Sequence, residues 1–131
     1  MSTRTASCSC GKLTATTPAT PIRVSVCHCL ACQKRTGSVF GTSARFERSS
    51  VTIAGRSTTF VRIGDSGGRA TFHFCPDCGA TAYYVIDDQP DIIAIPVGAF
   101  ADPGFPPPTR SVYENRMHPW VHLPQELERT G

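Results

Sequence analysis

The chain has 131 residues, of which 40% are apolar and 18% charged, a balance typical of one folded domain (residues 1–131) and not of a disordered protein. Its formal charge of +3 is small and its basic residues are scattered, which argues against a nucleic-acid binder and leaves at most a weak attraction for a small anionic substrate. No stretch approaches the ~20 apolar residues of a membrane span, and residues 1–7 lack the apolar segment of a secretory signal, so we expect a cytoplasmic protein with no membrane partner.

The chain predicts short β-strands separated by turns. Eleven Gly and eleven Pro are many for this length and favour frequent turns over long helices. Several segments alternate apolar with polar residues and are rich in β-branched residues, as half-buried strands are. In chain order, these predicted strands are 12–17, 22–26, 40–46, 58–63, 70–74, 81–86 and 92–95.

Helix is predicted at only two places. Residues 30–35 form a helix-like patch of one or two turns that ends at Thr36-Gly37, where the glycine can take the C-cap position. Residues 125–129, after Pro124, predict a further helical turn. The proline-rich segment 102–108 is expected to be a stiff, irregular loop. The fold class is therefore predicted as all-β with little helix.

Seven cysteines fall into three clusters: Cys8 and Cys10; Cys27, Cys29 and Cys32; Cys75 and Cys78. Disulfides do not persist in a reducing compartment, and an odd number of thiols disfavours a disulfide framework, so metal binding is the better interpretation. Thiols one or two residues apart can converge on one ion, and two such clusters can complete a tetrahedral zinc site.

The clusters can be paired in two ways. Cys29 and Cys32 could join Cys75 and Cys78 in a four-thiolate site, leaving the other three thiols dispersed. Alternatively, the first and last clusters share one site, and the middle cluster forms a compact three-thiolate set that is open on one face. Gly11 and Gly79 favour the second pairing slightly, because each follows a cluster and allows backbone N–H groups to turn toward the sulfurs.

The three cysteine motifs, in this order, resemble those of the glutathione-dependent formaldehyde-activating enzyme family, also called the centromere protein V/GFA family. The C-terminal segment also resembles the closing segment of that family, which is a strand followed by Pro-Trp, here Pro119-Trp120. The resemblance extends from about residue 7 to residue 123, and its segments are 7–11, 27–38, 74–79 and 110–120.

This resemblance implies a β-tent, a fold of antiparallel sheets pinned by zinc. It also implies a structural zinc held by Cys8, Cys10, Cys75 and Cys78, and a catalytic zinc held by Cys27, Cys29 and Cys32. The implied reaction joins glutathione, or another small thiol, to a small aldehyde such as formaldehyde, and is classed in reverse as a carbon–sulfur lyase reaction.

The chemistry of the open site follows from its ligands. A free thiol has a pKa of about 8.5, and zinc coordination deprotonates it. A zinc held by three thiolates is electron-rich, so we expect it to activate and place a substrate thiol more than to act as a strong Lewis acid.

Few other residues suggest a function. Gln33, Lys34 and Arg35 follow the middle cluster and are candidates to contact the substrate carboxylates, although an exposed helix face explains them equally well. His28 should point away from an ion held by its neighbours. Trp120 is predicted to anchor the core or to cover the pocket.

His73 lies on the strand face opposite Phe72 and Phe74, and is expected to be exposed.

Two other functions compete with the enzyme: a zinc-stabilised binding module, in which both metals hold the fold, and a glutathione carrier without catalysis. A second zinc with an exchangeable fourth position favours the enzyme or the carrier over the module.

Overall fold

The structure is a computed structural model that describes residues 3–64 and 67–131. It consists mainly of strands, which confirms the predicted all-β class. The elements are β1 (Arg4–Ser7), β2 (Thr14–Thr17), β3 (Arg23–Cys27), α1 (Leu30–Thr36), β4 (Gly41–Glu47), η1 (Arg48–Ser50), β5 (Thr52–Ala54), β6 (Thr58–Ile63), β7 (Arg69–Phe74), β8 (Thr81–Ile86), β9 (Ile92–Pro96), η2 (Val97–Phe100), β10 (Arg110–Val112), η3 (Glu114–Arg116) and β11 (Glu128–Arg129). None of the helices in these residues is long and apolar enough to cross a membrane.

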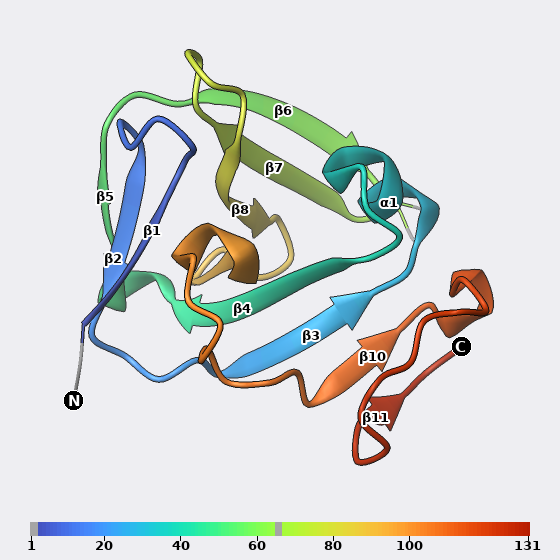
Figure 1. Ribbon diagram of the computed structural model, residues 1–131. Coiled ribbons are helices and arrows are strands. Elements are labelled where there is room, and N and C mark those ends of the chain that lie inside the picture. Colours follow the sequence, from blue (N-terminus) through green and yellow to red (C-terminus); the bar gives the residue numbers. More distant parts are fainter. Residues whose placement is uncertain (1–2, 65–66) are drawn as a thin grey trace.

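The strands form two sheets. A small antiparallel sheet has the order β1-β2-β5, and a large sheet has the order β11-β10-β3-β4-β9-β8-β7-β6. Neighbours in the large sheet are antiparallel from β3 to β6, whereas β10 runs parallel to both β3 and β11. Figure 1 shows the small sheet on one side of the molecule and α1 on the opposite side.

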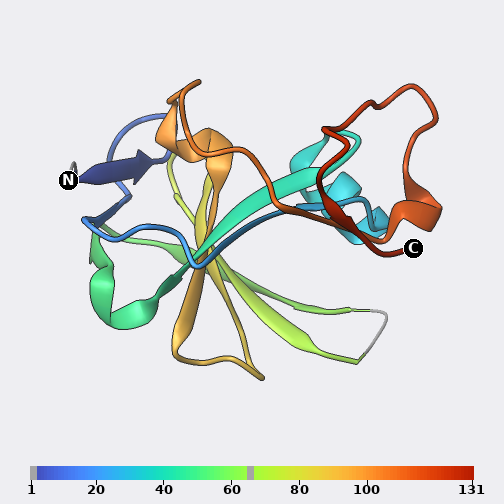
Figure 2. The same ribbon diagram turned by 90° about the horizontal axis from the view of Figure 1, so that it is seen from below.

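The large sheet divides into two wings, one formed by β11, β10, β3, β4 and β9 and the other by β8, β7 and β6. Strands β8 and β9 share a single register pair, Tyr84 with Ala94, whereas their neighbours pair over five or six residues. In Figure 2, the hairpin of β6 and β7 diverges from the wing of β3, β4 and β10. The two wings therefore present facing surfaces.

The main core lies between the small sheet and the large one. Its largest fully buried side chains include Phe46, Leu13, Ile93 and Ile95, each of which contributes about 1.5–3 kcal/mol when removed from water. Two cysteines, Cys8 and Cys75, belong to the same buried cluster, so the thiols that join β1 to β7 are part of the core.

Local sequence explains the single α-helix. The Sγ atom of Cys29, at the N-cap, accepts a hydrogen bond from the backbone N–H of Cys32, and Gly37 ends the helix in the left-handed conformation. The helix predicted over 30–35 is confirmed, and it extends one residue further. The predicted strands are confirmed as well, and segment 102–108 forms no helix or strand.

The helical turn predicted over residues 125–129 is wrong. Glu128 and Arg129 form β11 instead, because Glu128 donates its backbone N–H to the carbonyl of Thr109 at 3.0 Å and the N–H of Thr130 donates to Ser111 at 2.9 Å. Pairing with a distant strand outweighs local preference here. The strand pattern also missed β1, β5 and β10, which are too short to show a clear alternation, although the family resemblance implied a strand in the segment that contains β10.

Gly55 provides a test of this packing. It has φ +100°, and a Cβ atom added there would lie 1.9 Å from the carbonyl oxygen of Lys12. We expect Gly55→Ala to lower the free energy of unfolding by about 2–4 kcal/mol, because it adds both backbone strain and a backbone clash. Urea denaturation measures the change. Gly98→Ala is the control, since nothing lies within 4 Å of its added Cβ, and an equal loss in the two variants would contradict the packing described here.

Candidate metal centres and the cavity beside one of them

The first cysteine group joins two turns that are far apart in the sequence. Cys8 and Cys10 lie in the β1–β2 turn, and Cys75 and Cys78 lie in the β7–β8 turn. Their four sulfurs all lie within 4.8 Å of one another, and Cys10 Sγ is 3.6 Å from both Cys8 Sγ and Cys75 Sγ. A tetrahedron with zinc–sulfur bonds of about 2.3 Å has edges of about 3.8 Å, so this group fits a zinc ion.

Backbone N–H groups stabilise negative charge on these sulfurs. Leu13 N–H donates to Cys8 Sγ at 3.2 Å, and Asp77 N–H donates to Cys75 Sγ at 3.4 Å. Burial raises the pKa of the Cys8 thiol, but the hydrogen bonds from Leu13 and the neighbouring thiols lower it to about 6. A backbone hydrogen bond from Lys12 lowers the pKa of Cys10, but burial and the neighbouring thiols raise it to about 11. A thiolate is thus favoured at Cys8, and a metal ion would replace the protons that the group shares.

The two turns have matching backbone geometry. Gly11 and Gly79 follow the two cysteine pairs and have φ values of +83° and +80°, which other residues rarely adopt. An exposed ion pair between Lys12 Nζ and Asp77 Oδ2, at 3.1 Å, also joins the turns, although exposed pairs contribute little to stability.

The second cysteine group lies where β3 ends and α1 begins. The sulfurs of Cys27, Cys29 and Cys32 lie within 4.8 Å of one another. The structure thus groups the thiols as four and three, which is the second of the two pairings considered above. Three thiolates fit a zinc that keeps one coordination position for another ligand.

Hydrogen bonding and charge favour a thiolate at Cys32. A hydrogen bond from Cys27 is the largest cause that lowers the pKa of Cys32, to about 5, with burial opposing it and Arg62 and Arg35 assisting. The same hydrogen bond, together with burial, raises the pKa of Cys27. A cation at this site would replace the shared proton.

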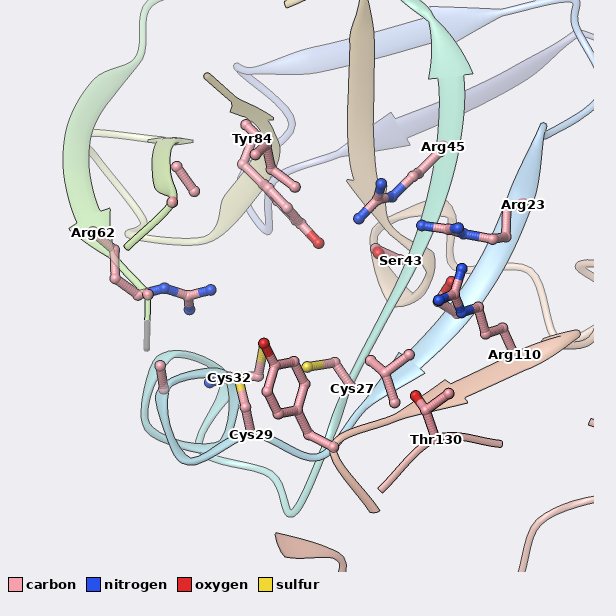
Figure 3. A pocket seen from close by; sticks show the side chains of 18 of the residues that line it. Arg23, Cys27, Cys29, Cys32, Ser43, Arg45, Arg62, Tyr84, Arg110 and Thr130 are labelled. Carbon is pink, nitrogen blue, oxygen red and sulfur yellow. Dashed lines mark hydrogen bonds between the residues drawn. The ribbon is translucent and has the colours of Figure 1, made fainter. Parts of the chain in front are cut away.

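A cavity of about 460 Å³ adjoins the second group (Figure 3). All three of its thiols line the cavity, together with side chains from both wings of the large sheet. Figure 3 shows Tyr84 and Arg62 on one side, and Arg23, Arg45 and Arg110 on the other.

The lining of this cavity is strongly basic. It includes Arg23, Arg45, Arg62, Arg69 and Arg110, and the described lining residues include no Asp or Glu side chain. The sequence pattern did not predict this basic lining. Strand periodicity could have indicated part of it, because residues 23, 25 and 27 must share one face of a strand that ends in a thiol.

Gln33, Lys34 and Arg35, which the sequence offered as substrate contacts, are not among the described residues that line this cavity. Gln33 Nε2 donates to the carbonyls of His28 and Arg116, at 2.9 and 3.2 Å, and its Oε1 lies 3.0 Å from His118 Nε2. Gln33 therefore fastens α1 to the C-terminal segment.

The other two candidates differ from each other in their surroundings. Lys34 is exposed, whereas the Arg35 guanidinium lies 4.9 Å from the ring centre of Phe72 and 5.5 Å from that of Tyr84. Arg35 thus stacks on aromatic side chains behind the cavity wall, within range to favour a negative charge on Cys32.

Two histidines and the tryptophan are also placed by the structure. His28 is fully buried and its Nε2 lies 3.0 Å from Ser111 Oγ, so it points away from the neighbouring thiols, as predicted. His73 is half-buried and stacks on Tyr83 at 4.3 Å, so the prediction that it is exposed was wrong. Trp120 is 66% exposed and is not among the described lining residues of the cavity, so the prediction that it anchors the core or covers the pocket was wrong. Backbone pairing and Gln33 hold the C-terminal segment instead.

A solved structure described as a Rhodobacter sphaeroides protein has 19% sequence identity and a TM-score of 0.57, over 79% of this chain and 91% of that one, which shows a similar fold. No curated protein matches the chain significantly. The sequence profile of a family described as "Glutathione-dependent formaldehyde-activating enzyme" matches residues 3–120, which include all seven cysteines. The chain therefore belongs to the glutathione-dependent formaldehyde-activating enzyme family.

Proposed function

We propose that this protein is a zinc-dependent enzyme that joins a small thiol to a small aldehyde, as in the formation of S-(hydroxymethyl)glutathione from glutathione and formaldehyde, and that it works in the cytoplasm. The observation that supports this most strongly is the position of the three-thiol group in the wall of a cavity. A site that only stabilises the fold needs no such access. This distinguishes the enzyme from a zinc-stabilised binding module.

Cys27, Cys29 and Cys32 would hold the second zinc, and the other four cysteines would hold the first. When bound at the three-thiolate site, zinc supplies a position at which a substrate thiol binds as its thiolate. In the reaction, the thiol sulfur forms a bond to the aldehyde carbon, the carbon–oxygen π bond breaks, and the thiol proton ends on the new hydroxyl group.

Tyr84 is our candidate to stabilise the aldehyde oxygen. Its side chain is buried in the cavity wall, and Figure 3 shows its hydroxyl directed toward the space above the thiols. Burial raises the pKa of Tyr84, and Ser43 and Arg35 offset this only in part, so the hydroxyl keeps its proton at neutral pH. Tyr84 Oη can therefore donate a hydrogen bond to the oxygen as negative charge develops on it.

The four-thiol group can be tested through folding. We expect Cys75→Ser to be unfolded at 25 °C, because a structural zinc contributes about 10–16 kcal/mol, as much as the whole stability of a small domain. Circular dichroism and zinc analysis measure the result. Ser9→Ala, an exposed change between Cys8 and Cys10, is the control. A folded Cys75→Ser protein that retained all its zinc would rule out this role.

The three-thiol group can be tested through metal content and turnover. We expect Cys29→Ser to keep the fold, lose one zinc per chain and lose at least about tenfold in kcat/KM for glutathione and formaldehyde. Thermal unfolding shows whether the fold is intact. Full turnover in a variant that lacks this zinc would refute the proposed mechanism, and global unfolding would make the second site structural, as in a binding module.

The role of Tyr84 can be tested by removing its hydroxyl oxygen. We expect Tyr84→Phe to lower kcat by about 100-fold, as the loss of one hydrogen-bond donor to a developing oxyanion does, with little change in zinc content. Steady-state kinetics measures this. Tyr83→Phe is the matched control, since Tyr83 is the preceding residue on β8 and stacks on His73. Equal kcat values in the two variants would remove Tyr84 from the mechanism.

A further inference from the structure

Three arginines meet on one wall of the cavity. Arg23 on β3 and Arg45 on β4 are direct cross-strand partners. Arg110 on β10 pairs with Ser25, two residues along β3 and on the same face as Arg23. All three line the cavity and are labelled together in Figure 3. Like charges directly opposite each other destabilise a sheet, so this arrangement costs the fold stability.

These arginines lack the partners that would offset that cost. The Nε atoms of Arg23, Arg45 and Arg110 are buried and have no hydrogen-bond partner among the described residues. None of the three takes part in a described ion pair, and the contact from Arg45 Nη1 to Gln89 Oε1, at 2.9 Å, involves a neutral amide. A buried donor without an acceptor carries a free-energy penalty that a bound anion would remove.

The pKa of Arg23 also reflects the lack of a compensating negative charge. Burial lowers the pKa of Arg23, and the positive charges of Arg45 and Arg110 lower it further. The carboxylate of Glu128 acts in the opposite direction but does not reverse the shift. A bound group that carries negative charge would relieve this repulsion.

The cluster and the thiols lie along one strand. Arg23, Ser25 and Cys27 occupy alternate positions of β3 and all line the cavity. Four residues of strand span about 13 Å, and long arginine side chains shorten the gap. Between the two ends, the buried Ser25 Oγ has no partner among the described residues. One small molecule could therefore place an anionic group on the arginines and a sulfur at the second cysteine group.

Glutathione matches this wall poorly. Its two carboxylates are at opposite ends of the molecule, and one of them lies beside an ammonium group. Three guanidinium groups in one cluster match more than one negative charge at a single place. The described lining residues also offer no Asp or Glu side chain to an ammonium.

We propose that the substrate thiol, or its aldehyde adduct, carries a multiply charged anionic group, either a phosphate or closely spaced carboxylates, that Arg23, Arg45 and Arg110 bind. This inference rests on the proposed function and names the class of thiol on which the enzyme acts. It makes the arginine cluster the determinant of substrate choice, and the cysteine group the place of reaction.

Binding of simple anions tests the inference on the zinc-loaded protein. Inorganic phosphate, malonate and S-methylglutathione are titrated at constant ionic strength and followed by calorimetry. We expect phosphate or malonate to bind more tightly than S-methylglutathione, and the better of the two identifies the anionic group. S-Methylglutathione is used because its sulfur has no proton to lose to a metal. Tighter binding of S-methylglutathione than of both anions would overturn the inference, as would no binding of either anion.

A pair of variants tests the residues. Arg45→Gln should weaken binding of the preferred anion by about tenfold or more, because it removes a charge-assisted hydrogen bond. Arg56→Gln, which removes the same charge from an exposed site outside the described cavity lining, should leave binding unchanged. Without the anion, Arg45→Gln should unfold at the same or a higher temperature than the wild type, since it relieves repulsion. Equal anion affinity in the two variants would overturn the inference.

Turnover of glutathione with formaldehyde, measured on the same protein, separates this inference from the proposed function. Anion binding that depends on Arg45, with no turnover of any thiol, would refute the enzyme and leave the anion site. Turnover of glutathione without anion binding would refute the anion site and leave the enzyme.

Discussion

The convergence of four thiols between two distant turns is the constraint on which the rest of the molecule depends. It joins Cys8 and Cys10 to a turn 65 residues further along the chain. The small sheet and the large sheet meet at this point, and Cys8 and Cys75 are part of the main core that forms between them. A chain of this size buries a modest core, so a metal-bound junction can supply a large share of its stability.

The second cysteine group also consists of neighbouring thiols, but it lies in a different part of the fold. Its thiols come from one short stretch, where β3 runs into α1, and they face the space between the wings instead of the core. The two wings join where β8 and β9 share a single register pair. The thiols beside the core and the thiols beside the cavity thus form two separate groups, and the large sheet connects them.

The sequence alone predicted much of the fold and the grouping of the thiols. Period-two alternation revealed the longer strands, and Gly37 marked the end of α1. The missed strands β1, β5 and β10 have three or four residues each, and they exist because distant partners satisfy their backbone. Spacing could not reveal the arginine cluster, because Arg110 reaches it only through parallel pairing with β3.

The parallel pairing of β10 with β3 has a consequence for the order in which the protein is made. By the time synthesis has reached Phe105, the chain carries both cysteine groups and the residues of the main core. Arg110 and the segment that Gln33 fastens to α1 are added later. The residues of the main core and both cysteine groups thus precede, in the sequence, the strand that adds Arg110 to the cavity wall, so changes in that strand alter the cavity and leave the main core unchanged.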